Sequence, residues 1–220
     1  MSENIRLVKI NEWVFQVRMP EGKGLFPVIL MLHGLTGDEK SMWVFSSRLP
    51  SQAMIIAPRG LYRTPLGGYT WHPHQPQPWP SFSDFIPTVE KLTHILTEDY
   101  FPQAEFSVIN LVGFSQGAAL ALSFLLKLPG RVNLLAGLSG FLPLGAADLA
   151  LPHTLDGKRI FLAHGVQDEQ IPVERARQTA MVLEAAGADV IYCEDDIGHK
   201  ISASCFRGLE AFFAGDSVGS

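Results

Sequence analysis

The sequence predicts an α/β fold in which a mostly parallel central sheet carries helices on both faces. Apolar segments of strand length alternate with helix-length segments along the chain, as in the βα units of a parallel sheet. The segment 26–34, FPVILMLHG, is continuously apolar, as expected for a strand covered on both faces. With 220 residues, 47% of them hydrophobic, the chain can bury a sizeable core, and we expect a single domain over 1–220.

Each element follows from its local pattern. The first two strands alternate in polarity, and the later ones are apolar runs bounded by turn residues. The expected strands are 5–10, 13–19, 26–34, 53–60, 106–114, 132–140, 158–165 and 188–195. Helices are expected where apolar residues recur at helical spacing, or where an apolar segment follows a strand-ending turn. The expected helices are 83–100, 116–127, 173–186 and 201–214.

One segment, 59–81, interrupts this alternation. It reads RGLYRTPLGGYTWHPHQPQPWPS, and its five prolines and three glycines predict irregular structure near the active site. Its aromatic residues argue against disorder, and loops at the carboxyl ends of parallel strands favour ligand sites. We expect a wall or lid over a substrate pocket, with Tyr69, Trp71 and Trp79 binding substrate. The alternative is an Ω-loop packed on its own aromatic side chains.

Composition and motif content exclude several function classes. The net charge is −5 and no Lys/Arg cluster is present, so nucleic acid is not an expected partner. No apolar run reaches the roughly 20 residues of a membrane span, and no signal-peptide pattern opens the chain, so no stable membrane anchoring is expected. Cys193 and Cys205 match no metal spacing and predict a reduced, cytoplasmic setting. A homodimer is left open as an alternative to a monomer.

Cofactor motifs are missing from the sequence. Neither G-x-G-x-x-G nor G-x-x-x-x-G-K-[ST] occurs, so no nucleotide cofactor is expected. His72 and His74 in WHPHQP are too few ligands for a structural metal site, and we expect a solvent-facing loop there and no metal.

Ser115 is the candidate nucleophile. It lies in GFSQG, between a strand-like segment and a helix-like one. A strand that turns sharply into a helix strains the corner residue, and Gly113 and Gly117 supply the required lack of bulk. The helix that follows directs its free N–H groups and its positive dipole end toward the same point. Ser139 in GLSGF is a weaker rival, because the second glycine and a clear following helix are both missing.

A serine hydroxyl needs a base and an orienting acid. In the chain order serine, acid, histidine, His199 in EDDIGHKIS is the base, and Asp168, at the carboxyl end of a strand, is the favoured acid. Asp195 and Asp196, three or four residues before His199, remain competitors for the acid. His164 fits this order poorly and is interpreted as a structural histidine bonded to loop backbone.

Acyl transfer also requires donors for the oxyanion. The backbone N–H of Gln116, at the start of the helix after the serine, is one candidate. The second comes from the loop after an earlier buried strand, where Gly34 allows a turn and the Leu35 N–H is our choice. A glycine-rich turn without a ligand is the alternative.

Four motifs together resemble a known family. HGLTGD, GFSQGA, HGVQDEQIP and IGH, at these spacings, resemble the phospholipase/carboxylesterase family of α/β-hydrolases, which includes the acyl-protein thioesterases and small bacterial carboxylesterases. The resemblance covers residues from about 25 to 213. It implies an α/β-hydrolase fold, with Ser115 as nucleophile, Asp168 as orienting acid and His199 as base. It also implies an oxyanion hole at Leu35 and Gln116.

The leading functional hypothesis is a serine carboxylesterase that hydrolyses small carboxylic esters or thioesters through an acyl-enzyme on Ser115. The resemblance also places Trp71 near an acyl groove. The alternatives on the same fold are an acyl-protein thioesterase or lysophospholipase, and a dienelactone-type hydrolase. A non-catalytic binding protein on a hydrolase scaffold is the alternative from another class.

Overall fold

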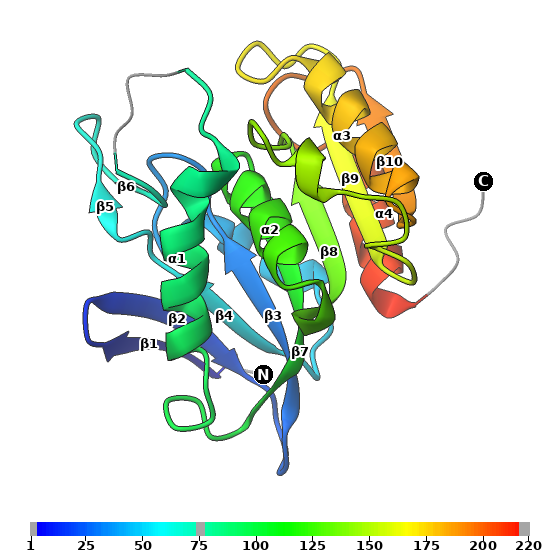
Figure 1. The fold of residues 1–220 in the computed structure, drawn as a ribbon. Helices are drawn as coiled ribbons and strands as arrows, with labels where there is room; N and C mark the ends of the chain where they lie inside the picture. The colour runs from blue at the N-terminus through cyan, green and yellow to red at the C-terminus, as the bar shows by residue number, and fades with distance from the viewer. Residues whose placement is uncertain (1–3, 74–77, 216–220) are drawn as a thin grey trace.

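The computed structural model describes residues 4–73 and 78–215 and is built around an eight-stranded sheet (Figure 1). The order of the strands is β1-β2-β4-β3-β7-β8-β9-β10, and all neighbours from β4 onward are parallel, whereas β1 and β2 are antiparallel to theirs. The strands are β1 Asn4–Ile10, β2 Trp13–Met19, β3 Phe26–Leu32, β4 Met54–Pro58, β7 Ala104–Phe114, β8 Val132–Leu138, β9 Arg159–Gly165 and β10 Asp189–Asp195.

Helices cover both faces of the sheet. The α-helices are α1 Phe82–Ile95, α2 Gln116–Lys127, α3 Val173–Ala185 and α4 Ala203–Ala214, and the 3-10 helices are η1 Ser41–Arg48, η2 Pro129–Arg131 and η3 Ala147–Leu149. One buried cluster packs α1, α2 and α3 against one face, and a second packs α4 and η1 against the other. The predicted α/β class and the mostly parallel sheet are therefore confirmed. No helix within 4–73 or 78–215 is long and apolar enough to cross a membrane.

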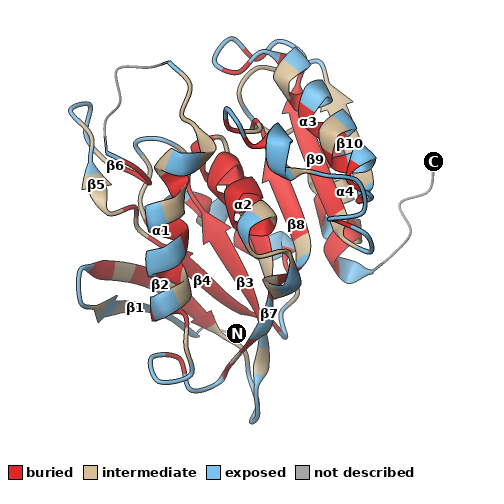
Figure 2. Ribbon diagram, viewed as in Figure 1, coloured by how far each residue is buried: buried red, intermediate tan, exposed pale blue. Residues whose placement is uncertain are grey.

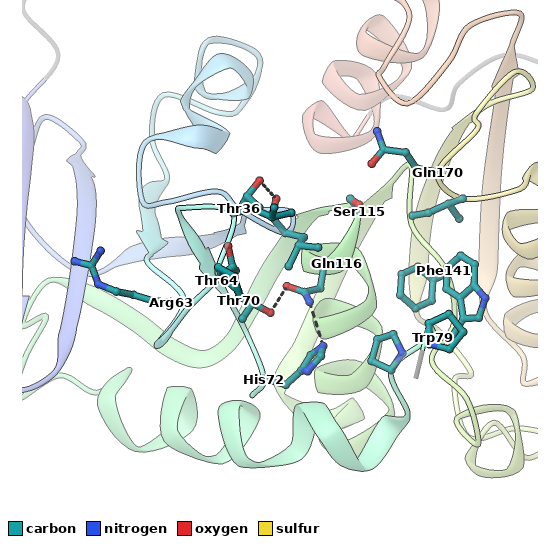
Figure 3. A pocket seen from close by; sticks show the side chains of 16 residues that line it. Thr36, Arg63, Thr64, Thr70, His72, Trp79, Ser115, Gln116, Phe141 and Gln170 are labelled. Atoms are coloured by element: carbon teal, nitrogen blue, oxygen red, sulfur yellow. Dashed lines mark hydrogen bonds between the residues drawn. The ribbon is translucent and has the colours of Figure 1, made fainter. Parts of the chain in front are cut away.

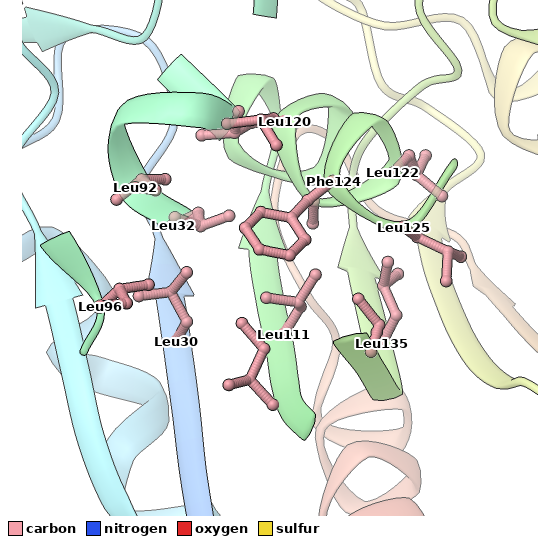
Figure 4. Packing of buried hydrophobic residues seen from close by; sticks show 14 of the residues in the cluster. Leu30, Leu32, Leu92, Leu96, Leu111, Leu120, Leu122, Phe124, Leu125 and Leu135 are labelled. Carbon is pink, nitrogen blue, oxygen red and sulfur yellow. The ribbon is translucent and has the colours of Figure 1, made fainter. Parts of the chain in front are cut away.

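The central strand β3 explains why a continuous apolar run is needed. Val28, Leu30 and Leu32 enter the cluster under α1 and α2, whereas Ile29 and Met31 enter the cluster under α4. Alternate side chains of a strand point to opposite faces, so a strand covered on both faces must be apolar throughout. Figure 2 shows the buried centre of the sheet, and Figure 4 shows leucines of α1, α2 and the strands packing around Phe124.

The predicted strands all form, but the first predicted helix ends early. The pattern predicts a helix over 83–100, and α1 ends at Ile95. The chain then turns, because Phe101 inserts into the core, where its ring meets Phe15 edge-on at 5.3 Å between centroids. Pro102 follows directly and disfavours helical backbone at Phe101.

The composition of the segment 59–81 predicts irregular structure throughout, but part of the segment is regular. It contains a small antiparallel hairpin, β5 Tyr62–Arg63 and β6 Tyr69–Thr70, which forms a separate two-stranded sheet. Gly67 and Gly68 both have positive φ, +87° and +71°, and this left-handed backbone closes the turn between the two strands. The prediction of irregular structure is wrong for these four strand residues.

The two cysteines are not free. Cys193 on β10 and Cys205 in the first turn of α4 form a disulfide, 12 residues apart. The prediction of two reduced thiols is therefore wrong, and the cysteine content no longer supports a cytoplasmic location. The disulfide closes a loop that contains His199.

Candidate active site

Ser115 occupies a strained corner between β7 and α2. Its backbone has φ 54° and ψ −118°, a region that non-glycine residues rarely adopt. A Cβ added to Gly113 would lie closer than 3.0 Å to the Gly117 carbonyl, and one added to Gly117 would lie closer than 3.0 Å to the Leu32 carbonyl. Both glycines are therefore required by the close approach of α2 to the sheet, and the turn projects the Ser115 hydroxyl from the carboxyl end of β7.

The structure brings the three predicted side chains together at that edge. His199 Nε2 lies 3.0 Å from Ser115 Oγ, and His199 Nδ1 lies 2.6 Å from Asp168 Oδ2. The Asp168 side chain is fully buried, and its other oxygen accepts the N–H groups of Gln170 and Ile171, each at 2.9 Å. A carboxylate at Nδ1 assigns the proton to that nitrogen, so Nε2 faces the Ser115 hydroxyl as an acceptor.

The competing acids are not hydrogen-bonded to His199, and the competing histidine, His164, lies against Asp168, with its Nε2 3.4 Å from Asp168 Oδ2. Asp195 accepts a hydrogen bond from Ser204 Oγ at 2.7 Å, and Asp196 is exposed. His164 is buried, and its Nε2 donates to the Ile171 carbonyl at 2.8 Å, the backbone bond that the sequence interpretation expects. Of the predicted acids, Asp168 contacts the His199 imidazole.

The loop after β3 lies directly over Ser115. A Cβ built on Gly34 would be 3.3 Å from the Ser115 Cβ and 3.2 Å from the Phe114 ring, so only glycine allows this approach without displacement. Leu35 and Gln116 line the same cavity as Ser115. Gln116 is the first residue of α2, so its N–H has no acceptor within the helix and is available to a ligand. The two predicted oxyanion donors thus border the serine.

Trp71, which the sequence predicts to bind substrate, does not line the cavity that contains Ser115. Its side chain is fully buried and is absent from the cavity wall, and its Nε1 donates to the His33 carbonyl at 2.7 Å. The His33 ring lies 4.4 Å from the Trp71 ring, donates from Nδ1 to the Gly34 carbonyl at 2.7 Å, and accepts the Gly60 N–H at Nε2. Trp71 and His33 together hold the backbone of the loop over Ser115. Burial lowers the pKa of His33 from 6.5 to about 4, so this histidine is neutral near pH 7.

Tyr69 also belongs to the support of that loop and not to the cavity wall. Its carbonyl accepts the Thr36 N–H at 2.9 Å, and its N–H donates to the Gly37 carbonyl at 3.0 Å. Arg59 donates to both oxygens of the buried Glu39, at 2.6 and 2.9 Å, and also reaches the Tyr69 hydroxyl at 3.2 Å. Burial opposes ionisation of Glu39, but the hydrogen bond from Arg59 prevails and the pKa of Glu39 is lowered.

Sequence reasoning missed Glu39 and Arg59. The signal that could have found them is a pair of opposite charges, one in HGLTGDE and one directly after β4, in two loops that a parallel sheet brings to the same edge.

A cavity of about 380 Å³ opens beside Ser115, and we call it the Trp79 pocket. Trp79, which the sequence predicts to bind substrate, lines this cavity, and its ring meets Phe141 edge-on at 5.1 Å. The Arg175 guanidinium lies 4.0 Å from the centre of the Trp79 ring and fixes this wall from behind. Figure 3 shows Trp79 and Phe141 facing the opposite wall across the cavity.

The opposite wall is polar. Gln116 Oε1 accepts from Thr70 Oγ1 at 3.0 Å, and Gln116 Nε2 lies 3.1 Å from His72 Nε2 (Figure 3). His72 is buried, so the prediction that it faces solvent is wrong: its packing against Phe85 and its bond to Gln116 draw it inward. His74 lies outside the described residues. In the described parts of the chain, no three His, Cys, Asp or Glu residues gather as a potential metal site.

The fold and the hydrogen-bonded Ser–His–Asp arrangement together define an α/β-hydrolase. Residues 16–214 match the model of the phospholipase/carboxylesterase family, and the chain belongs to this family. The resemblance that the motifs indicate is therefore confirmed.

Two relatives are similar in sequence to part of this chain. The chain is 31% identical over 108 residues to acyl-protein thioesterase 1 of Gibberella zeae, covering 47% of this chain and 46% of that protein. It is 30% identical over 110 residues to a probable carboxylesterase SOBER1-like protein of Arabidopsis thaliana, covering 47% of this chain and 40% of that protein. The matched part thus spans about half the length of these relatives or less.

Solved structures share the whole architecture. A carboxylesterase from Mesorhizobium loti superposes with a TM-score of 0.74 at 23% identity, covering 97% of this chain and 100% of that one. The Bacillus cereus carboxylesterase gives a TM-score of 0.72 at 21% identity, covering 92% and 93%. At such identities the likeness establishes the fold.

Proposed function

We propose that this protein is a serine carboxylesterase that hydrolyses small carboxylic esters or thioesters through an acyl-enzyme on Ser115. The observation that carries the proposal is the continuous hydrogen-bonded chain from Ser115 through His199 to the buried Asp168. Family membership and the thioesterase and carboxylesterase names of the relatives agree with this chemistry.

The first half-reaction uses the Ser115 hydroxyl as nucleophile. His199 Nε2 takes the hydroxyl proton while Oγ bonds to the acyl carbon, and the carbonyl oxygen becomes an oxyanion. The backbone N–H groups of Leu35 and Gln116 stabilise this charge, in a position that the positive end of α2 also favours. Asp168 holds the imidazole in the required tautomer and stabilises its cation. The intermediate then collapses: the bond from the acyl carbon to the leaving oxygen or sulfur breaks, His199 gives its proton to that atom, and the alcohol or thiol departs while the acyl group stays on Ser115 Oγ.

The second half-reaction uses water. His199 takes a proton from water, the resulting hydroxide oxygen attacks the acyl carbon, and the bond to Ser115 Oγ breaks as His199 returns the proton. The carboxylic acid leaves and Ser115 is regenerated.

The Trp79 pocket supports the assignment to small substrates. Its volume of about 380 Å³ lies at the low end of the range for small-molecule sites, roughly 300–1,000 Å³. The acyl-protein thioesterase, lysophospholipase and dienelactone-type alternatives differ in acyl length and leaving group. They are separated by substrate preference and share the same nucleophile.

The test combines a substrate panel with trapping of the intermediate. p-Nitrophenyl esters and matching thioesters, from acetyl to dodecanoyl, should be hydrolysed with a preference for short acyl groups and with an initial burst of product. Intact-mass measurement after rapid acid quenching should detect one acyl group, mapped to Ser115 by peptide digestion. Ser115→Ala should abolish both the burst and the mass shift. A folded wild-type protein that hydrolyses none of these esters would instead favour the non-catalytic binding alternative.

A further inference from the structure

A second cavity adjoins the loop over Ser115, and it shares part of that loop as a wall with the Trp79 pocket. Its volume is about 500 Å³, and we call it the Phe206 pocket. Leu35 and Thr36 line both cavities and therefore lie between them as a ridge, next to Ser115. Two hollows separated by a ridge next to the nucleophile match the two halves of an ester, because the acyl group and the leaving group extend from the same carbonyl carbon.

The position of His199 decides which half enters which cavity. Lys200 and Ile201, which follow His199 directly, line the Phe206 pocket, as does Phe114, whose ring centre lies 5.0 Å from that of His199. The Trp79 pocket is lined instead by Ser115, Gln116 and Ile171.

In acylation the group that departs must lie beside the imidazole that gives it a proton. That group therefore extends toward the Phe206 pocket. The acyl group must then extend away from His199, into the Trp79 pocket.

We propose that the Phe206 pocket binds the alcohol or thiol half of the substrate, and that the Trp79 pocket binds the acyl half. This inference rests on the acyl-enzyme mechanism proposed above. When the tetrahedral intermediate collapses, the bond from the acyl carbon to the leaving oxygen or sulfur breaks. The proton that His199 Nε2 took from Ser115 passes to that atom, and the neutral alcohol or thiol departs through the Phe206 pocket.

The walls of the Phe206 pocket define the class of leaving group. They are mostly apolar: Phe45 and Phe206 stack at 5.3 Å between ring centres, with the Phe114 ring 6.5 Å from Phe45. Among the described residues that line it, Lys200 alone is charged, and its cation disfavours a positively charged leaving group. The pocket therefore fits a ring-sized apolar alcohol or thiol, such as a phenol or a naphthol.

The test uses two ester series and two matched truncations. One series keeps the butyryl group and varies the alcohol from ethanol to 2-naphthol, and the other keeps the alcohol and varies the acyl group. Phe206→Ala and Trp79→Ala each remove one half-buried aromatic ring, one from each pocket. Stopped-flow measurement separates the acylation rate from the deacylation rate of the butyryl-enzyme.

Phe206→Ala should lower kcat/KM for the naphthyl ester relative to the ethyl ester by about 10- to 100-fold, the loss expected from removing an aromatic contact surface. It should not slow deacylation, because the leaving group has already departed. Trp79→Ala should do the reverse, changing acyl-length preference and the deacylation rate.

A second variant guards against misfolding of Phe206→Ala. Val44, on the rim of the same pocket, is 66% exposed, so Val44→Trp can narrow the mouth without disturbing the core. It should reduce kcat/KM selectively for naphthyl esters.

The inference is overturned if the Phe206 and Val44 variants alter acyl-length preference or deacylation while leaving-group preference stays unchanged. Absence of both ester hydrolysis and any acyl-enzyme in the wild type would be a different result. It would remove the proposed function itself, and with it the basis of the assignment.

Discussion

Two loops border Ser115, and they are held in place by different means. The loop 33–40, after β3, is fixed by side chains from the distant segment 59–71, including the buried contacts of His33 and Trp71 and the Glu39–Arg59 ion pair. The loop 196–202, which carries His199, is fixed mainly by hydrogen bonds that Gln167 and Ser139 donate to its backbone carbonyls, and by the disulfide between Cys193 and Cys205.

The loop that carries His199 is held mainly by contacts to its backbone. Gln167 N–H donates to the Ile197 carbonyl at 2.9 Å, and Ser139 Oγ donates to the Lys200 carbonyl at 3.3 Å. A Cβ on Gly165 would lie closer than 3.0 Å to the carbonyl of Ile197, so glycine at the end of β9 allows this loop to pack against the sheet. The rival serine Ser139 is thus fully buried and supports the position of His199.

Because the loops 33–40 and 196–202 are held by different interactions, different substitutions and conditions should disturb each of them. The loop over Ser115 depends on charge and on the protonation of a buried histidine, so pH and charge-removing substitutions should disturb it. The His199 loop depends on a covalent link and on an acid that orients the base. Substitutions on one side should leave the other side folded.

The largest effect is expected on the His199 side, from Asp168→Asn. The neutral amide can present its NH2 group to Nδ1, which favours the wrong imidazole tautomer, and it removes the negative charge that stabilises the imidazole cation. Steady-state kinetics should show kcat reduced about 10⁴-fold with the fold unchanged by circular dichroism. Asp195→Asn is the control and should change kcat little. The reverse result would identify Asp195 as the acid.

The next largest effect is expected on the other loop, from Glu39→Gln. The substitution removes the negative charge of the Glu39–Arg59 ion pair and leaves the half-buried Arg59 without its counter-ion. The free energy of unfolding should fall by about 3 to 4 kcal/mol, and kcat should fall because the loop over Ser115 is displaced. Glu210→Gln breaks the exposed Arg48–Glu210 pair, and should cost under about 1 kcal/mol in a urea titration. Equal losses from both variants would show that Glu39 does not act as a buried ion-pair partner.

Removal of the disulfide tests how much this covalent link contributes to holding the loop that carries His199. Cys193→Ala with Cys205→Ala opens a loop of about 12 residues, which should lower the free energy of unfolding by roughly 3 kcal/mol through the entropy of the unfolded chain. Dithiothreitol should destabilise the wild type similarly and should not affect the double variant. A wild-type melting temperature that is independent of reductant would contradict the disulfide.

The smallest effect is expected from pH, through His33. Its pKa in the folded protein is about 4, against 6.5 for the ordinary imidazole, so the unfolded chain binds a proton in this window that the folded protein does not. The contribution to stability is complete above pH 6.5 and is lost as the pH falls toward 4. Denaturant titrations should show a loss of about 2 kcal/mol between pH 7 and pH 5. His33→Gln should lose this pH dependence, and an unchanged slope would assign it to another group.

The sequence predicts the features that depend on local pattern. The buried strands follow from apolar runs such as 26–34, and the strained corner at Ser115 follows from the two flanking glycines, whose lack of a side chain the packing of α2 demands. The meeting of Ser115, Asp168 and His199 follows from strand ends in a parallel sheet, which lie at one edge.

The sequence cannot predict which way an aromatic or polar side chain points. Trp71 and Trp79 lie in the same Pro- and aromatic-rich segment, 59–81. Trp71 is nevertheless buried under the loop after β3, whereas Trp79 lines the cavity. His72 turns inward because Gln116 offers it a partner that is distant in sequence. The disulfide likewise depends on the approach of β10 to α4, which the spacing of two cysteines does not reveal.

The central claim is that Ser115 is a nucleophile activated by His199. The most direct measurement is labelling with a fluorophosphonate probe, followed by peptide mapping and by a comparison of labelling rates. We expect a single adduct on Ser115 in the wild type, a much slower reaction in His199→Ala, and none in Ser115→Ala. An unlabelled wild-type protein, or an adduct on another residue that persists in Ser115→Ala, would contradict it.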